Sequence, residues 1–210
     1  MAEASDGRPG LGHDRRHNVH GRPCGRGQSG LYNQVTQAAP FEVFVSADQA
    51  TPAKAIAEGH AVAGTAFTYA TGKLVLFSKT DGLNLGEQTL KDGKFTKIAI
   101  ANPKTAPYGT AAVEVMQKLG VYDALKGKIV EGNNIAQTYQ FVDTANAEVG
   151  FIAFAQIALK PGGSRWVVPA NLHKTIAQDA VLLKTGANND AAKAFIAFLK
   201  GPEARKVIEK

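Results

Sequence analysis

The sequence predicts an α/β fold with a largely parallel sheet, because strand and helix patterns alternate along the chain from Ser29 onward. Two further observations support this class. The chain has 210 residues, of which 44% are hydrophobic and 20% charged, so it can bury a core as one large domain or two lobes. Several expected strands are continuous apolar runs, which is typical of strands covered on both faces.

A short helix, a strand and a second helix are expected first. The helix is predicted at 29–37, where Leu31 and Val35 lie four residues apart on one face. A strand rich in β-branched and aromatic residues follows at 41–47. The second helix, at 48–59, opens on an aspartate, contains an early proline and ends at a glycine, which are the usual boundary signals.

The rest of the chain contains most of the expected strands. Buried strands are predicted at 73–79 and 97–103, and the segment NPKTAPYG leads from the second of these into a helix at about 109–119. The remaining predictions are strands at 127–132, 148–154, 165–170 and 176–184, a helix at 135–143, and one or two amphipathic helices at 188–210 that break at Gly201 and Pro202.

Residues 1–28 differ in composition from the rest of the chain. They hold five of the seven arginines, whereas all seventeen lysines lie at Lys54 or later. The segment has almost no apolar periodicity, so we expect it to be a disordered basic tail. A stretch translated in a shifted reading frame, an arm that contacts nucleic acid or a membrane, and a metal-binding tract formed by His13, His17 and His20 are alternatives.

Several classes of enzyme and metal site are excluded by the motifs. The sequence has no GxSxG, no phosphate-binding GxxxxGK[ST] and no HExxH. Cys24 is the single cysteine, which excludes an internal disulfide and a thiolate metal cluster. Carboxylates such as Asp48 lie at expected helix starts, where capping is their ordinary role. We therefore expect no enzymatic activity and no cofactor.

Loops that carry small or hydroxylic residues into helix starts recur at three places. These are Ser29 with Gly30, residues 106–110, and residues 133–135. The first N–H groups of a helix have no partner inside it, and the helix dipole adds a positive potential, so each start can bind an anion. If the three starts converge, they could hold an oxyanion without a basic side chain, although each loop taken singly is better explained as an ordinary helix cap.

Four segments together resemble the periplasmic molybdate-binding proteins of molybdate ABC transporters. They are LYNQVTQAAPFEVFVSADQATPAKAI, ANPKTAPYGTAAVEVMQKLG, EVGFIAFAQIAL and AAKAFIAFLKGPEARKVIEK, and the resemblance covers Ser29 to Lys210. It implies a two-lobed type II periplasmic-binding-protein fold, with 29–79 and 173–210 in lobe 1 and 80–172 in lobe 2. The first lobe is expected to lack the opening strand-helix-strand of the family.

The resemblance also implies a function and a site. The protein is expected to capture molybdate or tungstate in the periplasm for an ABC transporter permease, as a monomer that does not bind nucleic acid. The ion would be held through Ser29, Tyr108 and Ile135, by a hydroxyl and by backbone N–H groups. Ala153 stands where some members of the family have a tyrosine. No signal peptide is visible in the chain.

Two other functions stay open at this stage. Ligand domains of this fold also occur in regulators, so the chain could be an oxyanion sensor. It could also be a truncated copy with impaired binding, because a strand-helix-strand unit takes roughly 30 or more residues. An enzyme built on the same fold is disfavoured, since no nucleophile, base or metal set is present.

Overall fold

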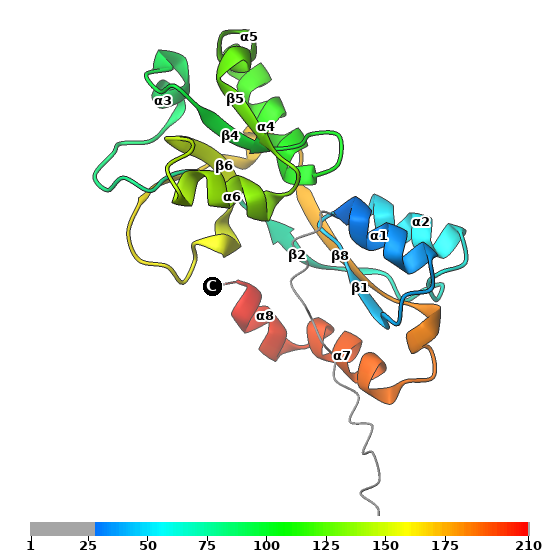
Figure 1. The fold of residues 1–210 in the computed structure, drawn as a ribbon. Helices are drawn as coiled ribbons and strands as arrows, with labels where there is room; N and C mark the ends of the chain where they lie inside the picture. The colour runs from blue at the N-terminus through cyan, green and yellow to red at the C-terminus, as the bar shows by residue number, and fades with distance from the viewer. Residues whose placement is uncertain (1–27, 210) are drawn as a thin grey trace, which may run out of the picture.

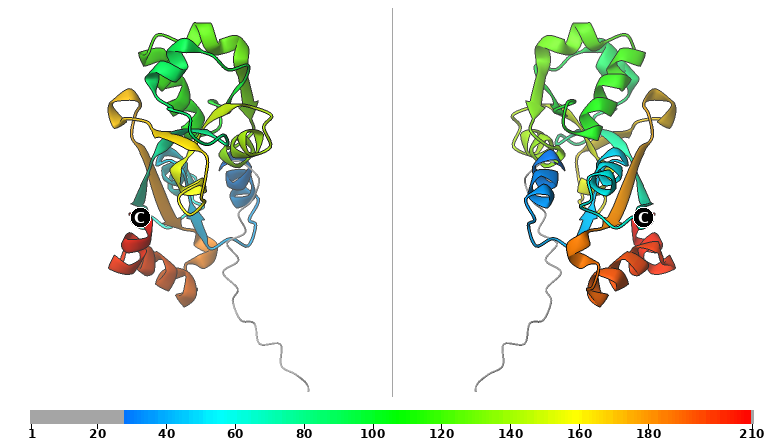
Figure 2. Two further views of the ribbon diagram at one scale, coloured as in Figure 1. Left: turned by 90° about the vertical axis from the view of Figure 1, so that its left-hand side faces the viewer. Right: turned by 90° about the vertical axis from the view of Figure 1, so that its right-hand side faces the viewer.

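The computed structural model describes residues 28–209, which form two β-sheets with helices packed around them. Figures 1 and 2 show the sheets in two bodies joined by crossing strands. The three-stranded sheet has the order β1 (Val43–Val45), β8 (Ile176–Leu182), β2 (Phe67–Gly72), and the five-stranded sheet has the order β5 (Ile129–Gly132), β4 (Ile98–Ala101), β6 (Val149–Ala153), β3 (Leu74–Ser78), β7 (Ser164–Val167).

Helices cover both sheets. We call the three-stranded sheet and its helices the small body, and the five-stranded sheet and its helices the large body. The small body holds α1 (Gln28–Thr36), α2 (Ala50–Ala57), η4 (Lys184–Gly186), α7 (Asp190–Lys200) and α8 (Pro202–Ile208), and the large body holds α3 (Glu87–Asp92), α4 (Pro107–Lys118), α5 (Tyr122–Leu125), η1 (Lys126–Lys128), α6 (Ile135–Asp143), η2 (Phe154–Gln156) and η3 (Ala170–Leu172).

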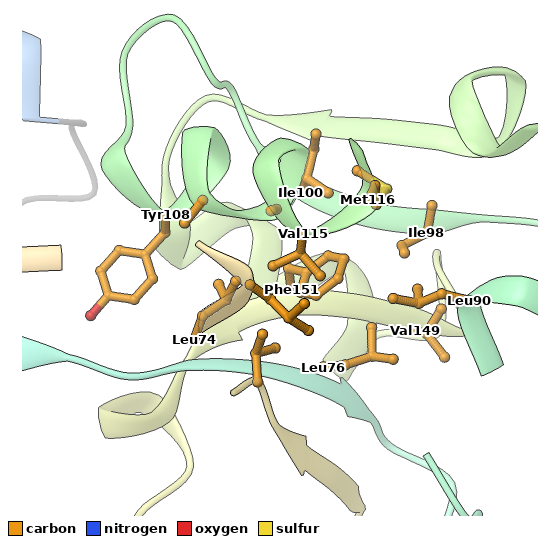
Figure 3. Close-up of a cluster of buried hydrophobic side chains, with 14 of the residues drawn as sticks. Leu74, Leu76, Leu90, Ile98, Ile100, Tyr108, Val115, Met116, Val149 and Phe151 are labelled. Atoms are coloured by element: carbon orange, nitrogen blue, oxygen red, sulfur yellow. The ribbon is translucent and has the colours of Figure 1, made fainter. Parts of the chain in front are cut away.

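The large body is buried on both faces of its sheet. Alternate residues of β3 point to opposite faces, so Leu74 and Leu76 join the core beneath α4 while Val75 and Phe77 pack on the side of α6. Figure 3 shows the first of these clusters, with Phe151 near its centre. This two-sided burial explains the continuous apolar runs in β3, β4 and β6, as the sequence predicts.

The small body uses the same alternation on a thinner sheet. Phe44 and Val181 pack against α1 and α2, whereas Val43 and Leu182 lie on the opposite face with α7. Strand β2 is only partly buried along its length. The three-stranded sheet is therefore sandwiched between two thin layers of helix.

The chain passes between the two sheets with almost no linker. Strand β2 ends at Gly72 and β3 begins at Leu74, so Lys73 alone separates a strand of one sheet from a strand of the other. The return passage leads from η3 through Thr175 into β8 at Ile176. Both passages lie between the bodies.

The prediction of a largely parallel sheet is wrong for the described residues. β4 pairs in parallel with β5 and β6, but β1 with β8, β2 with β8, β3 with β6 and β3 with β7 are antiparallel. The physical reason is the passage between sheets. The strands that leave or enter at the passages, β3 and β8, run against their neighbours, and this adds antiparallel pairs to an otherwise α/β arrangement.

Most predicted elements are confirmed, with small shifts in their ends. The helix predicted at about 109–119 begins earlier, at Pro107, because proline occupies its first turn. Strand β2 and helix α3 were not expected. Strand β3 falls within 29–79, the first range expected for lobe 1, yet it pairs in the five-stranded sheet.

The composition-based expectations for the amino-terminal segment fall largely outside the described residues. This applies to its disorder and to the opening strand-helix-strand of lobe 1, and both stay predictions. Gln28, the last residue of that segment, is the first residue of α1. Within residues 28–209, no helix is long and apolar enough to cross a membrane.

Candidate functional site

A cleft of about 640 Å³ lies between the two bodies. The start of α1 and the loop from β1 to α2 line it on the side of the small body. The loop from β4 to α4, with the first turns of α4, lines it on the side of the large body. The passage at 174–177 closes its back. Most of its walls are therefore loops and helix starts.

The start of α4 leaves one backbone N–H without a protein partner. Ala106 is the N-cap, in an extended conformation and without a side-chain cap, and Pro107 has no N–H. The N–H groups of Gly109 and Thr110 both donate to the Ala106 carbonyl, at 2.9 and 3.2 Å. Within residues 28–209, the Tyr108 N–H has no acceptor. This group can donate to a ligand.

Tyr108 itself is not a cleft-lining residue, although Ala106, Pro107 and Thr110 around it are. Its side chain is 5% exposed, and its hydroxyl accepts a hydrogen bond of 2.9 Å from Gln178 Nε2. Burial is the main cause that raises the pKa of Tyr108 to about 12. Only the backbone of this residue is thus suited to contact an anion in the cleft.

Gly109 holds this helix start close to strand β4. A Cβ at this position would lie 2.0 Å from the Ala101 carbonyl oxygen, which is far inside van der Waals contact. The close approach fixes where the first turn of α4 lies relative to the sheet. The backbone geometry around Tyr108 therefore depends on this glycine.

Ser29 faces the cleft from the opposite wall. It lies in the first turn of α1, which contains no acidic residue, and it lines the cleft beside Gln28. The Gln28 side chain donates to Thr51 Oγ1 at 2.7 Å and accepts from the Ala47 N–H at 3.2 Å, so it ties the start of α1 to the start of α2. Composition had placed Gln28 in the tail, and no sequence signal indicated this contact.

Asp48 lies one residue before Gln49, the N-cap of α2. Its carboxylate accepts from the Thr51 N–H at 2.8 Å and from the Ser46 hydroxyl at 3.2 Å. This is the capping role that the sequence predicts for Asp48. The negative charge leaves the start of α2, unlike the starts of α1 and α4, unsuited to an anion.

Ile135, like Tyr108 and unlike Ser29, is not among the residues that line the cleft. It is the first residue of α6, after the N-cap Asn134, whose side chain accepts from the Gln137 N–H at 2.9 Å. Ile135 is partly buried against the core of the large body and does not line the cleft. Its carbonyl accepts from Gln156 Nε2 at 3.0 Å.

The loops that carry Tyr108 and Ile135 nevertheless lie side by side. They follow β4 and β5, which are parallel neighbours, and the Asn102 N–H donates to the Gly132 carbonyl at 2.8 Å between them. The structure thus brings Tyr108 and Ile135 to one edge of the five-stranded sheet, and Ser29 lines the cleft together with the residues that flank Tyr108. A narrower cleft is needed for all three to meet one ion.

The rim of the cleft carries more positive than negative side chains. Lys54, Lys104 and Lys174 line it together with Asp48 and Glu114. Glu114 is engaged by the backbone N–H of Lys174 at 2.7 Å and by its ammonium at 3.9 Å. The described residues contain no group of three His, Cys, Asp or Glu side chains that could hold a metal cation. Lys54 is in turn paired with Glu58 at 3.7 Å, so Lys104 is the rim lysine for which no ion pair is found among the described residues.

A family model described as bacterial extracellular solute-binding protein matches residues 13–210. The chain belongs to this family. The molybdate-binding protein ModA of Rhodobacter capsulatus is 55% identical over 185 residues, covering 88% of this chain and 73% of the relative. ModA of Azotobacter vinelandii is 52% identical over 185 residues, covering 86% and 73%.

Solved structures agree with this assignment. The periplasmic molybdate-binding protein of Azotobacter vinelandii superimposes with a TM-score of 0.82 at 39% identity, covering 88% of this chain and 82% of that one. The resemblance and the two-lobed periplasmic-binding-protein fold inferred from the sequence are confirmed. Proteins of this kind bind solutes and are not enzymes, in agreement with the missing catalytic motifs.

Proposed function

We propose that this protein captures molybdate or tungstate as the substrate-binding component of an ABC transporter and passes the ion to a membrane permease. It acts as a monomer in the periplasm, without a cofactor or a nucleic-acid partner. The ion binds between the bodies, through the Ser29 hydroxyl and the backbone N–H groups of Tyr108 and Ile135. The names and high identity of the relatives support this choice of ligand.

The single observation that carries the proposal is the unpaired Tyr108 N–H at the start of α4, whose neighbours Ala106 and Pro107 line the same cleft as Ser29. Each hydrogen bond to a charged group contributes about 1.5 to 3 kcal/mol. About four such bonds, with the helix dipoles, reach the roughly 8 kcal/mol of micromolar binding. A tetrahedral oxyanion presents enough acceptor oxygens to take this number of donors.

Closure of the cleft is part of the proposed mechanism. The cleft of about 640 Å³ is much larger than one oxyanion, since a water molecule takes only about 30 Å³ in the liquid. Movement about the passages at Lys73 and Thr175 would bring α1 and α4 onto the same ion, by the hinge closure that two-lobed binding proteins use. The exposed lysines of the rim attract the ion while the cleft is open.

Titration calorimetry with molybdate, tungstate, sulfate and phosphate tests the proposal. We expect molybdate and tungstate to bind far more tightly than the other two. Replacing Ser29 by alanine should weaken molybdate binding by about tenfold or more, the loss of one hydrogen bond to a charged group. Thr144→Ala is the matched control, because it removes an exposed hydroxyl at the carboxyl end of α6.

Two outcomes would contradict the choice of ligand. The first is a wild-type protein that releases no heat with molybdate, which would favour the alternative of impaired binding. The second is equal affinity for sulfate and molybdate, which would point to a general anion sensor. Loss of molybdate binding in both Ser29→Ala and Thr144→Ala would remove Ser29 from the site.

A further inference from the structure

Three side chains form a hydrogen-bonded connection from the start of α4 to the crossing strands. The Tyr69 hydroxyl on β2 donates to Gln178 Oε1 at 2.8 Å, and Gln178 Nε2 on β8 donates to the Tyr108 hydroxyl at 2.9 Å. Tyr69 and Gln178 belong to the small body, and Tyr108 belongs to the large body. We call Tyr69, Gln178 and Tyr108 the interbody triad.

The triad is packed closely against the passage between the sheets. A Cβ at Gly72 would lie 2.3 Å from the Tyr108 hydroxyl oxygen and 2.8 Å from Gln178 Nε2, so the glycine admits both groups. Figure 3 shows Tyr108 at one end of the core cluster, with its hydroxyl pointing away from Val115 and Phe151. The ring is thus anchored in one body while the hydroxyl reaches the other.

Both tyrosines stay neutral at physiological pH. Burial raises the pKa of Tyr108 to about 12, with Tyr69 adding to the rise. Burial also raises the pKa of Tyr69 to about 12, assisted by the nearby Asp179 carboxylate. Both hydroxyls are therefore protonated at neutral pH, where they can keep their hydrogen bonds to Gln178.

Within the triad, Tyr108 is the residue that connects to the cleft, because it also carries the unpaired N–H at the start of α4. Its N–H belongs to the second residue of α4, and its ring and hydroxyl are held at the passage between the sheets. A change in the hydroxyl contact would let the first turn of α4 move relative to Ser29 on the other wall. Misplaced donors lose strength steeply with angle and distance.

We propose that the interbody triad positions the start of α4 relative to the small body and thereby sets the affinity for the oxyanion. Tyr69, Gln178 and the Tyr108 hydroxyl are positioning residues, since none of these groups contacts the ion. The effect on affinity rests on the proposed molybdate-binding function. The effect on the relative position of the bodies does not depend on any ligand.

Tyr108→Phe removes one hydroxyl and keeps the ring. We expect the Kd for molybdate to rise by about three- to tenfold, mainly through faster dissociation, which corresponds to the loss of one neutral hydrogen bond. Tyr69→Phe should act in the same direction but less strongly, because it leaves the bond from Gln178 to Tyr108 in place. Calorimetry and stopped-flow dissociation provide the measurements.

The matched control is Tyr122→Phe. Tyr122 packs against the same core, and within residues 28–209 its hydroxyl makes no hydrogen bond. It should leave the Kd unchanged. A purely structural role for Tyr108 would lower the Tm of the unliganded protein without changing the Kd measured well below that temperature, and this result would overturn the proposal.

A measurement without ligand separates this inference from the proposed function. Spin labels are attached at Asp123→Cys on α5 and Asp190→Cys on α7, in a chain carrying Cys24→Ser. In the unliganded protein, Tyr108→Phe should broaden the distribution of distances between the labels, and Tyr122→Phe should not. A distribution unchanged by Tyr108→Phe would overturn the triad's role whether or not the wild type binds molybdate. Absence of molybdate binding by the wild type, with the broadening present, would contradict the proposed function alone.

Discussion

The two bodies are both built of a β-sheet covered by helices, but the strands of the large body are much more fully buried than those of the small body. In the large body, β3, β4 and β6 are buried at every residue and apolar clusters fill both faces of the sheet. In the small body, β2 is only partly buried and β1 has three residues. The stability of the molecule is therefore concentrated on one side of the cleft.

The difference bears directly on binding, because one wall of the cleft comes from each body. The wall formed by α4 rests on a dense core through Gly109, whereas the wall formed by α1 rests on a small cluster around Phe44. The small body adds polar contacts instead, as in Asp179, which is 8% exposed and accepts from Thr68 Oγ1 at 2.7 Å. Ligand binding should stabilise the small body more than the large body, because the small body has the weaker core before the ligand binds.

The largest effect is expected from cavities in the two cores. Phe151→Ala in the large body should lower the free energy of unfolding by about 4 kcal/mol, near the middle of the range for buried phenylalanines. Phe44→Ala in the small body should cost about 3 kcal/mol, because Phe44 lies in a smaller buried cluster and is 5% exposed. Urea unfolding of both variants measures the difference. Equal losses would show that the two cores are equally well packed.

The second effect concerns the wall formed by α4. Gly109→Ala places a methyl group against the Ala101 carbonyl and should destabilise the protein by about 2 to 3 kcal/mol. It should also abolish detectable molybdate binding by displacing the Tyr108 N–H. Gly127→Ala is the control, because a Cβ there meets no atom within 4 Å. Wild-type affinity in Gly109→Ala would contradict the role given to this helix start.

The third effect is a dependence on pH in the large body. Burial alone would raise the pKa of Glu148, but hydrogen bonds from the N–H groups of Lys97 and Thr96 outweigh it and lower this pKa below its ordinary value of 4.5. The resulting stabilisation is present above pH 4.5 and is lost as the pH falls through the folded pKa. Glu148→Gln should cost about 1 kcal/mol at pH 7, allowing for solvent screening, and less at pH 3. Urea unfolding of both proteins at the two pH values measures this cost. An equal cost at both would contradict a lowered pKa of Glu148 in the folded protein.

The smallest effect is expected at the edge of the small body. Among the described strands, β1 pairs with β8 alone, and Val45 on β1 is 42% exposed. An edge strand with an exposed apolar side chain can pair with another chain. Val45→Lys should therefore reduce self-association in light scattering, while changing the free energy of unfolding by less than about 0.5 kcal/mol. Unchanged scattering would show that this edge is not exposed to other molecules.

Elements with strong local signals were predictable from the sequence. Helix α6 has the predicted ends, and the break between α7 and α8 falls at Gly201 and Pro202. Strand β2 has the weak, half-exposed sequence FTYATG and becomes a strand because β8 pairs with it. The direction of pairing was not predictable either, since it depends on where the chain passes between the sheets.

The site was predictable only in part, for a related reason. The start of α4 can be inferred from Pro107, and Ser29 from its place in the first turn of α1, because both signals are local. The contact of Gln178 with Tyr108 joins residues 70 positions apart and has no sequence pattern. The same holds for the lysines of the rim, which come from three separate segments.

Lys73 is the single residue between β2 of the three-stranded sheet and β3 of the five-stranded sheet, and this short connection affects how the protein unfolds on heating. Because only Lys73 separates the two strands, loss of the β2 pairing disturbs the start of β3, which is buried in the large body. The molecule should therefore unfold in a single transition whose midpoint is governed by the small body, despite the denser core beside it. A ligand that holds the bodies together would then raise the melting temperature of the whole chain by protecting its less stable part.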